Sequence, residues 1–301
     1  MLIYIIFIFI LFLILLLLYH IIPVINHGYK IKLLSTTEQL YRYHKQIKTF
    51  ENKMSTWYPL NLVEEFRIDH GNNYYDFFRR MGKIYMNIVL DKNKKIIGTF
   101  SGVLRNINNI NIWYLCDLKI DYKHRGNMLT LQIIMNSLRL RNITKKFYAV
   151  SMNNGDSLNK VVKLANKISK STYIKIKTET MYIYSVESSK MEKIKNILEL
   201  YKGPLYYVNI NKLKSLILRS TNKSMNLYHV NFLKNINYTK NGNEQIFSTP
   251  IDGTIMFCFH KKDNINNILK MNGIITDTSA TIIHNLDFEP SEWDFIQTSE
   301  I

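Results

Sequence analysis

One stretch of the chain has the residue types and spacing of a phosphate-binding turn. An apolar, strand-like run over residues 110–118 leads into the basic turn 123–126, and apolar positions at helical spacing follow. Such a turn brings backbone N–H groups and a helix N-terminus to one place, where they can bind a phosphate or pyrophosphate. Lys123 and Arg125 add positive charge there. The sequence therefore predicts a phosphate-binding turn between a strand and a helix.

The residues of this turn resemble the central motif of the GNAT superfamily of N-acetyltransferases. The family pattern is Gln/Arg-x-x-Gly-x-Gly/Ala, and only its first position is matched, by Arg125; Met128 and Thr130 replace the family glycines. The resemblance implies that acyl-CoA, with an acetyl or a longer chain, is the co-substrate. The residues it assigns to acyl-CoA binding are Arg125, Gly126, Asn127, Met128, Leu129, Thr130 and Asn154.

The strand before the turn is also similar to N-myristoyltransferases, which look like two fused GNAT units. The similarity lies in Tyr114-Leu115-Cys116, followed at a longer spacing by Arg125. It implies that the backbone N–H groups of Tyr114 and Leu115 polarise the thioester carbonyl. Donors freed by a strand bulge can stabilise the oxyanion of an acyl-transfer intermediate.

An acyl transfer to an amine also needs a base and an acid. GNAT proteins often carry the base as a carboxylate on the fourth strand, and Asp117 stands there. The alternative is a structural carboxylate paired with a lysine. Asn153 or Asn154 can stand for the family's asparagine, but no tyrosine lies within 157–169, where the family's acid is found. A catalytically inactive, GNAT-like binding or structural module therefore stays open as an alternative.

Hydrophobic periodicity predicts a mixed α/β fold over residues 29–188. The period of two gives strands and the period of 3.6 gives helices, in the order β-α-α-β-β-β-α-β-α-β, with an irregular stretch at 53–70. That order resembles a GNAT-like mixed sheet flanked by helices, and we expect a V-shaped opening between the strands that hold Tyr114 and Phe147, facing the Arg125 turn.

The pattern of residues 190–301 predicts a second, smaller α/β unit. One interpretation is that this unit is a degenerate second GNAT repeat. It includes a predicted helix over 211–218 and a hairpin that turns at Asp252-Gly253. The polar, acidic tail carries Glu289, Glu292, Asp294 and Glu300.

The first residues predict a transmembrane anchor over 1–24. Residues 2–18 contain no charged side chain, and the apolar run over 2–22 ends at Pro23. At 1.5 Å per residue, about 20 residues span the hydrocarbon core of a bilayer. A cleaved signal peptide is the alternative, although a basic start and a small-residue cleavage site are missing. Lys30 and Lys32 flank the run, which favours a single-pass membrane protein with a cytoplasmic body.

The net charge of +17 comes mostly from lysines scattered along the chain. Nucleic acid is an unlikely partner because no recognition motif accompanies the charge. Anionic lipid headgroups fit an anchored body better. The abundance of Lys, Asn and Ile is typical of AT-rich coding sequence and points to a viral source. Eight histidines without metal-ligand spacing predict no metal site, and two cysteines exclude a disulfide scaffold.

Overall fold

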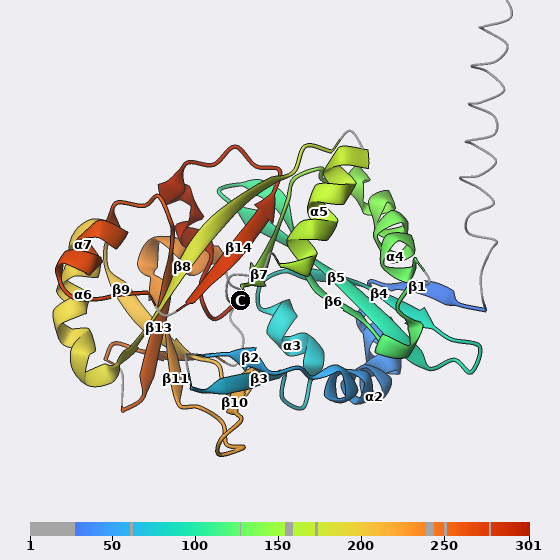
Figure 1. The fold of residues 1–301 in the computed structure, drawn as a ribbon, viewed down its shortest axis with the longest axis horizontal. Coiled ribbons are helices and arrows are strands. Elements are labelled where there is room, and N and C mark those ends of the chain that lie inside the picture. Colours follow the sequence, from blue (N-terminus) through green and yellow to red (C-terminus); the bar gives the residue numbers. More distant parts are fainter. Residues whose placement is uncertain are drawn as a thin grey trace, which may run out of the picture.

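The structure is a computed structural model (Figure 1). It describes residues 28–60, 63–126, 128–153, 159–171, 174–238, 244–249, 252–276 and 278–301. The predicted anchor, residues 1–24, lies outside them. Among the described residues, no helix is both long and apolar enough to cross a membrane.

Eleven strands of the described chain form one mixed sheet, and three more form a small antiparallel sheet. In spatial order, the strands of the large sheet are β1 (Lys30–Leu34), β4 (Lys83–Leu90), β5 (Ile96–Ile107), β6 (Ile110–Ile120), β7 (Phe147–Met152), β14 (Thr278–His284), β8 (Lys177–Glu187), β13 (Thr254–His260), β11 (Leu227–Phe232), β9 (Leu205–Asn209) and β12 (Gln245–Phe247). The small sheet contains β10 (Ser215–Leu218), β3 (Glu65–Asp69) and β2 (Tyr58–Pro59).

Helices connect and cover these strands. The α-helices are α2 (Thr37–Met54), α3 (Tyr74–Arg79), α4 (Leu129–Ser137), α5 (Lys160–Ser171), α6 (Ser188–Lys202) and α7 (Ile265–Met271). The 3-10 helices are η1 (Tyr122–His124), η2 (Leu138–Asn142), η3 (Leu233–Tyr238) and η4 (Pro290–Phe295). The N-terminus of α2 shows the local cause of one helix: the Thr36 side chain accepts a hydrogen bond from the Gln39 N–H, and the Gln39 side chain bonds back to the backbone of Thr36.

The structure runs β1-α2-β2-β3-α3-β4-β5-β6-α4-β7-α5-β8, so the predicted element order of the first part of the chain is confirmed except for β2 and β3. Three local predictions are wrong. The stretch 53–70 holds β2 and β3, and β10 occupies part of the helix predicted over 211–218. The hairpin predicted at Asp252-Gly253 does not form, since β13 pairs with β8 and β11, and β12 pairs with β9.

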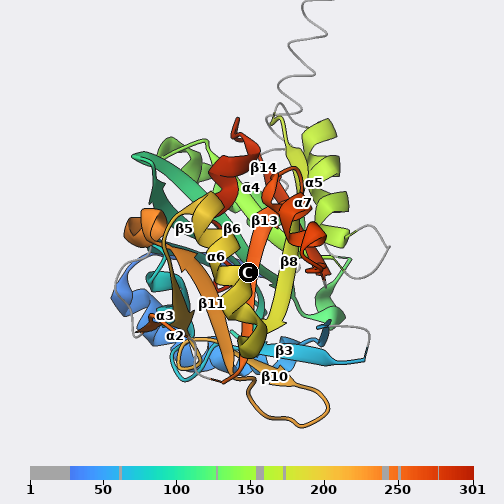
Figure 2. The same ribbon diagram turned by 90° about the vertical axis from the view of Figure 1, so that its left-hand side faces the viewer.

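The second part of the chain does not form a sheet of its own. Strand β14 lies between β7 and β8 and is antiparallel to both, and β13 continues the sheet from β8 (Figure 2). The boundary predicted near residue 190 therefore does not separate two sheets. The chain has a GNAT-like mixed α/β fold in which α6, α7 and the strands from β9 to β13 extend the same sheet.

The large sheet is covered on both faces near β4, β5 and β6. Along β4, Ile88 packs in the cluster that includes α2 and α3, while the next residue, Val89, packs against Leu129 and Ile133 of α4. This alternation places α2 and α3 on one face and α4 on the other. Helix α5 packs through Val162 and Ala165 on Ile283 of β14 and Ala149 of β7.

The last part of the polar tail is buried, although Glu289 and Glu292 are exposed. Residues 293–300 are buried, and the chain ends in the middle of the molecule (Figure 1). The acidic residues are neutralised by buried cations: Asp294 binds Lys202, at 3.0 Å from each carboxylate oxygen, and Glu300 binds Arg105. For Asp294 and Glu300, ion pairing compensates for the loss of water.

Candidate functional site

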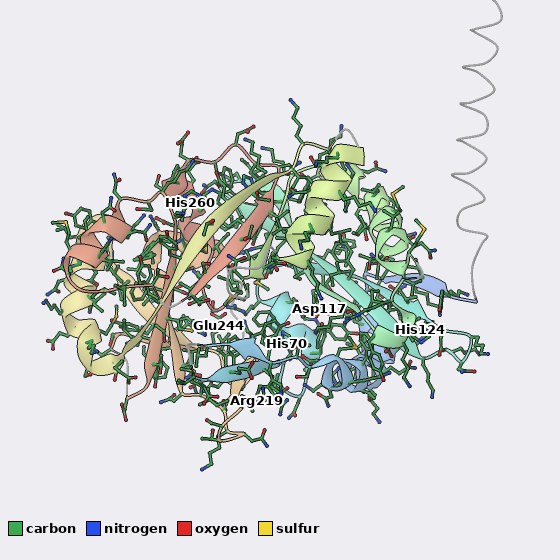
Figure 3. The ribbon with its side chains drawn as sticks, in the orientation of Figure 1. His70, Asp117, His124, Arg219, Glu244 and His260 are labelled. Carbon is green, nitrogen blue, oxygen red and sulfur yellow. The ribbon has the colours of Figure 1, made fainter. Side chains whose placement is uncertain are left out.

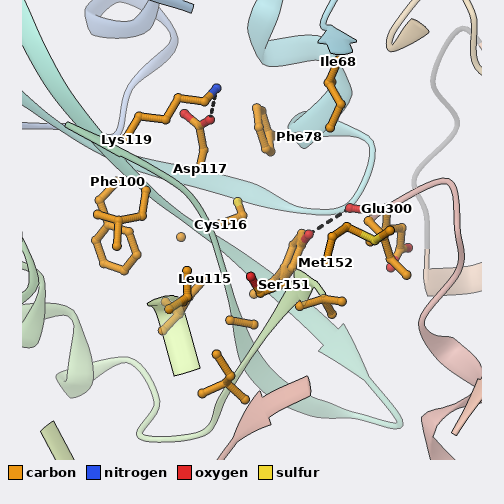
Figure 4. Close-up of a pocket in the computed structure, with 18 of the residues that line it drawn as sticks. Ile68, Phe78, Phe100, Leu115, Cys116, Asp117, Lys119, Ser151, Met152 and Glu300 are labelled. Atoms are coloured by element: carbon orange, nitrogen blue, oxygen red, sulfur yellow. Dashed lines mark hydrogen bonds and ion pairs between the residues drawn. The ribbon is translucent and has the colours of Figure 1, made fainter. Parts of the chain in front are cut away.

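Strands β6 and β7 are paired over only two residues and then separate. The parallel register joins Trp113 to Phe147 and Tyr114 to Tyr148, while β6 continues to Ile120 and β7 to Met152. Figure 4 shows side chains of both strands around the space between them. The opening expected between the strands of Tyr114 and Phe147 is therefore present, but no described residue of the Arg125 turn lines it.

A bulge in β6 accompanies this separation. Between the pairs Thr99–Lys119 and Ser101–Cys116, β5 has one residue and β6 has two, Asp117 and Leu118. Asp117 has a φ of +55°, a left-handed conformation that bends the strand.

The bulge lies beyond the residues to which the carbonyl-polarising role was assigned. Tyr114 pairs with Val103 of β5 and with Tyr148 of β7, whereas Leu115 pairs with Gly102 of β5 and with no described residue of β7. The bulge is therefore not at Tyr114 or Leu115 themselves, and the carbonyl-polarising role of their N–H groups stays a prediction. The irregular backbone in β6 is at Asp117 and Leu118.

A cavity of about 790 Å³ passes through the opening. On the side of α4 and α5, Leu115, Ile134 and Ala165 line it. On the side of α2 and α3, Phe78 and Met152 line it. One cavity thus reaches both faces of the sheet at the point where β6 and β7 part, and most of its lining is apolar.

Asp117, the predicted base, lines this cavity but is engaged on both carboxylate oxygens. Lys119 Nζ lies 2.5 Å from Oδ1 (Figure 4). The hydroxyls of Tyr74 and Thr99 donate to Oδ2. Burial disfavours the charged form of Lys119, but the charge of Asp117 and its hydrogen bond raise the lysine pKa overall. Asp117 is therefore a fixed, ion-paired carboxylate, as the structural alternative expected.

Glu51 and His70 also line the cavity, although no motif or spacing in the sequence selects them. Glu51 comes from α2, and His70 immediately follows β3. The His70 Nδ1 atom is hydrogen-bonded to Glu51 Oε1, and Lys48 Nζ donates to Glu51 Oε2 at 2.9 Å. His70 and Asp117 lie near each other in the middle of the molecule (Figure 3), linked by Tyr74, whose ring centroid is 5.1 Å from that of His70.

The predicted phosphate-binding turn has the expected backbone but borders a separate hollow. After η1, Gly126 has a φ of +90° and Met128 a φ of +54°, and helix α4 begins without a side-chain cap. The residues that border this hollow of about 230 Å³ include Arg125, Gly126, Met128, Leu129 and Thr130. None of these residues lines the large cavity. Asn127 and Asn154 lie outside the described residues.

The Arg125 guanidinium is turned back toward its own strand. Its Nε donates to the carbonyl of Ile120 at 3.2 Å. The neighbouring His124 accepts or donates a hydrogen bond with the Tyr29 hydroxyl at 3.1 Å, and so is a packed turn residue. The uncapped N–H groups at the start of α4 keep the turn suitable for an anion.

Four further cations lie at the edge of the large cavity, on the side of α4 and α5. They come from η2, the following loop and α5: Arg141, Lys145, Lys160 and Lys163. All four are exposed, and none forms an ion pair with a described residue. Their scattered positions in the sequence did not indicate a shared binding site, because only the fold brings these four residues together.

Two polar residues, Ser151 of β7 and Asn159 just before α5, line the cavity where β7 ends. Asn159 donates through Nδ2 to Ser151 Oγ and to the carbonyl of Met152, both at 2.7 Å. Asn153, one of the two asparagines predicted to serve here, is instead bound to Ser279 and Thr281 of β14. Ser151 and Asn159 are therefore the polar groups that this end of the cavity presents.

Neither cysteine has the environment of a nucleophile. Burial, together with the charge of Asp117, raises the pKa of the Cys116 thiol well above its ordinary value. Cys258 is buried, which also raises its pKa, and its thiol donates to the carbonyl of Ile296. Within the described residues, no three His, Cys, Asp or Glu side chains are arranged to hold a metal ion.

Comparisons with known proteins give distant similarities. No family model matches the chain. An uncharacterized protein, L340, of Acanthamoeba polyphaga mimivirus is 24% identical over 242 residues, which cover 76% of this chain and 68% of that protein.

The solved structures with similar folds include several acetyltransferases. A Trypanosoma brucei acetyltransferase is 17% identical, with a TM-score of 0.33 over 46% of this chain and 91% of its own. A GCN5-related glucosamine N-acetyltransferase region of a fungal multi-domain β-N-acetylglucosaminidase is 7% identical, with a TM-score of 0.49 over 86% of this chain and 38% of its own. Arabidopsis thaliana glucosamine-6-phosphate N-acetyltransferase is 11% identical, with a TM-score of 0.32 over 48% of this chain and 92% of its own. Because these scores are low, the assignment of a GNAT-like fold rests on the element order and on the opening between β6 and β7.

Proposed function

We propose that this protein is an acyl-CoA-dependent N-acyltransferase that acts on an amine acceptor. The observation that carries the proposal is the cavity that crosses the sheet between β6 and β7. Such a cavity lets a thioester enter from one face and an amine from the other, so that the two meet in the gap. Holding two reactants in one orientation can supply a large part of the rate enhancement of a bimolecular reaction.

The side of α4 and α5 suits the acyl-CoA. The cations Arg141, Lys145, Lys160 and Lys163 give its phosphates positive partners, and the turn that begins α4 offers free N–H groups. The apolar lining beyond them, which includes Leu115, Ile134 and Ala165, fits an acyl chain. Transfer of each methylene from water to such a lining is worth about 0.8 kcal/mol, or roughly fourfold in affinity.

Calorimetric titration of the full chain in detergent tests this proposal. We expect binding of acyl-CoA, and at least tenfold tighter binding of a decanoyl than of an acetyl thioester, because the lining is apolar and the cavity is large. Free CoA without an acyl chain is the control for the headgroup. If neither thioester binds at millimolar concentration, the proposal that the protein is an acyltransferase is wrong.

The second candidate function is a GNAT-like binding module without catalysis. The observation that favours it is the full engagement of Asp117 by Lys119, Tyr74 and Thr99. We expect such a module to bind acyl-CoA without consuming it, whichever of several amines is present. A similarity to N-myristoyltransferases, with two fused units, belongs to the enzyme proposal and implies a long acyl chain.

We also propose that residues 2–22 anchor the protein in a membrane, with the body on the cytoplasmic side and its lysines near anionic lipid headgroups. The support is the uncharged apolar run and the net charge of +17. The mimiviral relative supports the proposed viral source. Extraction of membranes from expressing cells with alkaline carbonate tests the anchor. A protein released by carbonate would contradict it.

A further inference from the structure

We propose that His70, held by Glu51, is the base that removes the proton from the attacking amine. This inference rests on the proposed acyl-transfer function and assigns one of its chemical roles. The candidate on β6, Asp117, has both carboxylate oxygens engaged by fixed donors. A different proton acceptor is therefore needed in the cavity, on the side from which the amine enters.

The geometry of His70 fixes which of its nitrogens carries the proton. Its Nδ1 is hydrogen-bonded to Glu51 Oε1, and both side chains are buried, with exposed fractions of 8% and 5%. An ionised carboxylate can only accept a hydrogen bond, so the proton of the neutral imidazole is on Nδ1. The lone pair is then on Nε2, which is the atom that a general base uses.

Glu51 is itself held as an anion in one orientation. Lys48 Nζ donates to its Oε2 at 2.9 Å and to Asp69 Oδ1 at 2.6 Å. Burial opposes ionisation of Glu51, but the interactions with His70 and Lys48 outweigh it and lower its pKa to about 2. A carboxylate that stays ionised over the whole working pH range keeps His70 in a single tautomer.

The Nε2 atom of His70 is the one polar atom of this pair that is left for a substrate. It makes no hydrogen bond with any described residue, and His70 lines the cavity. Around the ring lie Tyr74, Phe77 and Phe78, with centroids 5.1, 5.0 and 5.3 Å away. These rings hold the imidazole in place without competing for its lone pair.

The position of His70 agrees with this role. It lies in the part of the cavity on the side of α2 and α3, across the sheet from Arg141 and Lys163. An acyl-CoA bound by those cations leaves the His70 side of the opening to the acceptor. The charged groups around His70 are Glu51, Asp117 and Lys119; burial has the largest effect and lowers the pKa of His70, so the imidazole is neutral at pH 7.

The step balances without a further reactant. The amine nitrogen attacks the thioester carbonyl carbon, the C–N bond forms, and His70 Nε2 takes the amine proton. The C–S bond breaks, its electron pair leaves with the CoA sulfur as a thiolate, and the proton passes from His70 through solvent to that sulfur. The products are an amide and the CoA thiol.

The test uses the full chain, decanoyl-CoA and a set of primary amines that includes a glycyl peptide, glucosamine and spermidine, with the released thiol as readout. His70→Gln is expected to lower kcat by about a hundredfold or more, the usual contribution of a positioned base, while the Kd for decanoyl-CoA stays within twofold. Glu51→Gln keeps the imidazole, so it is expected to lower kcat about tenfold and to move the acid limb of the pH profile. His44→Gln, a substitution outside the cavity, is the matched control and should leave both values unchanged.

The outcomes separate this inference from the function on which it rests. If the wild-type protein does not bind decanoyl-CoA, the proposed function fails. If it binds and acylates an amine, but His70→Gln keeps kcat within threefold, the function stands and the role of His70 is overturned. If it binds decanoyl-CoA but acylates no amine, the proposed transferase function fails, and the role of His70 fails with it. Thermal unfolding checks each variant, and Glu51→Gln keeps the test valid if His70→Gln does not fold.

Discussion

Asp117 joins a strained backbone to a buried charge. Its φ of +55° places it in the left-handed region, which asparagine and aspartate tolerate better than other residues. Its carboxylate forms an ion pair with Lys119 and accepts hydrogen bonds from the hydroxyls of Tyr74 and Thr99. The residue therefore fixes the bulge of β6, and with it the point where β6 leaves β7.

Asp117→Asn isolates the charge, because asparagine keeps the left-handed conformation. We expect the free energy of unfolding to fall by about 2 kcal/mol, since Lys119 loses its partner in a mostly buried site. Urea unfolding measures it. Asp287→Asn removes the carboxylate of the exposed Lys177–Asp287 pair and should change stability little. An unchanged stability with a large loss of turnover would contradict the structural role and point to Asp117 as the base.

Three buried histidines give the protein a defined response to acid. Burial lowers the pKa of His70, His229 and His284, most strongly for His229. In the unfolded chain their pKa is near 6.5, so below that pH the unfolded state binds more protons than the folded state. The stability that they contribute is present above about pH 6.5 and is lost as the pH falls through their folded-state pKa values.

We therefore expect the free energy of unfolding to decrease between pH 7 and pH 5. Urea unfolding at half-unit intervals of pH measures the slope, and His70→Gln should make it shallower. A stability that stays constant or rises over this range would show that these imidazoles are already protonated in the folded protein.

At the scale of elements, α5 and η2 supply charges that no local pattern predicts. Arg141 and Lys163 belong to different elements and meet only because both pack beside the opening between β6 and β7. The double substitution Arg141→Ala/Lys163→Ala is expected to weaken acyl-CoA binding about tenfold at low salt and less at high salt, because exposed charges are screened.

Calorimetry at two salt concentrations checks this prediction. Lys190→Ala/Lys193→Ala removes two exposed lysines of α6 that do not line the cavity, and should leave the affinity unchanged. An equal loss in both double variants would mean that only the net charge matters.

The sequence predicted the elements that its local periodicity encodes and missed those that depend on distant partners. The meander β4–β5–β6 and helix α4 were predicted because period two changes to 3.6 between them. Strand β3 was missed because most of its pairing is with β10, far along the chain, while the nearby β2 pairs with it over only two residues. For the same reason His70, Glu51 and the cations beside the opening could not be chosen, since the fold alone brings them to the cavity.

At the scale of the whole molecule, the last residues tie the two parts of the sheet together. Glu300 forms a two-pronged ion pair with Arg105 of β5, at 2.6 and 2.9 Å, and neither side chain is more than 2% exposed. Arg80 donates to Glu244 and to the carbonyl of Ser299. Buried pairs of this kind connect segments that are distant in the sequence, so their loss should affect the whole fold.

Glu300→Gln is expected to lower the free energy of unfolding by about 3 kcal/mol, because the buried Arg105 loses its carboxylate. Thermal and urea unfolding measure the effect. Glu38→Gln breaks the exposed pair between Glu38 and Arg42 and should be close to neutral. Equal effects of the two substitutions would mean that the charge of Glu300 contributes nothing to stability.

The insertion of β14 between β7 and β8 has a consequence for the rate of folding. Both neighbours of β14 precede it by a long stretch of chain, and neither can complete its hydrogen bonds until β14 arrives. The entropy cost of closing such a long loop comes before the stabilising contacts form. Folding is therefore slow, on the order of milliseconds to seconds. During that time β7 and β8 expose unpaired edges, so newly made chains should depend on chaperones or low temperature to avoid aggregation.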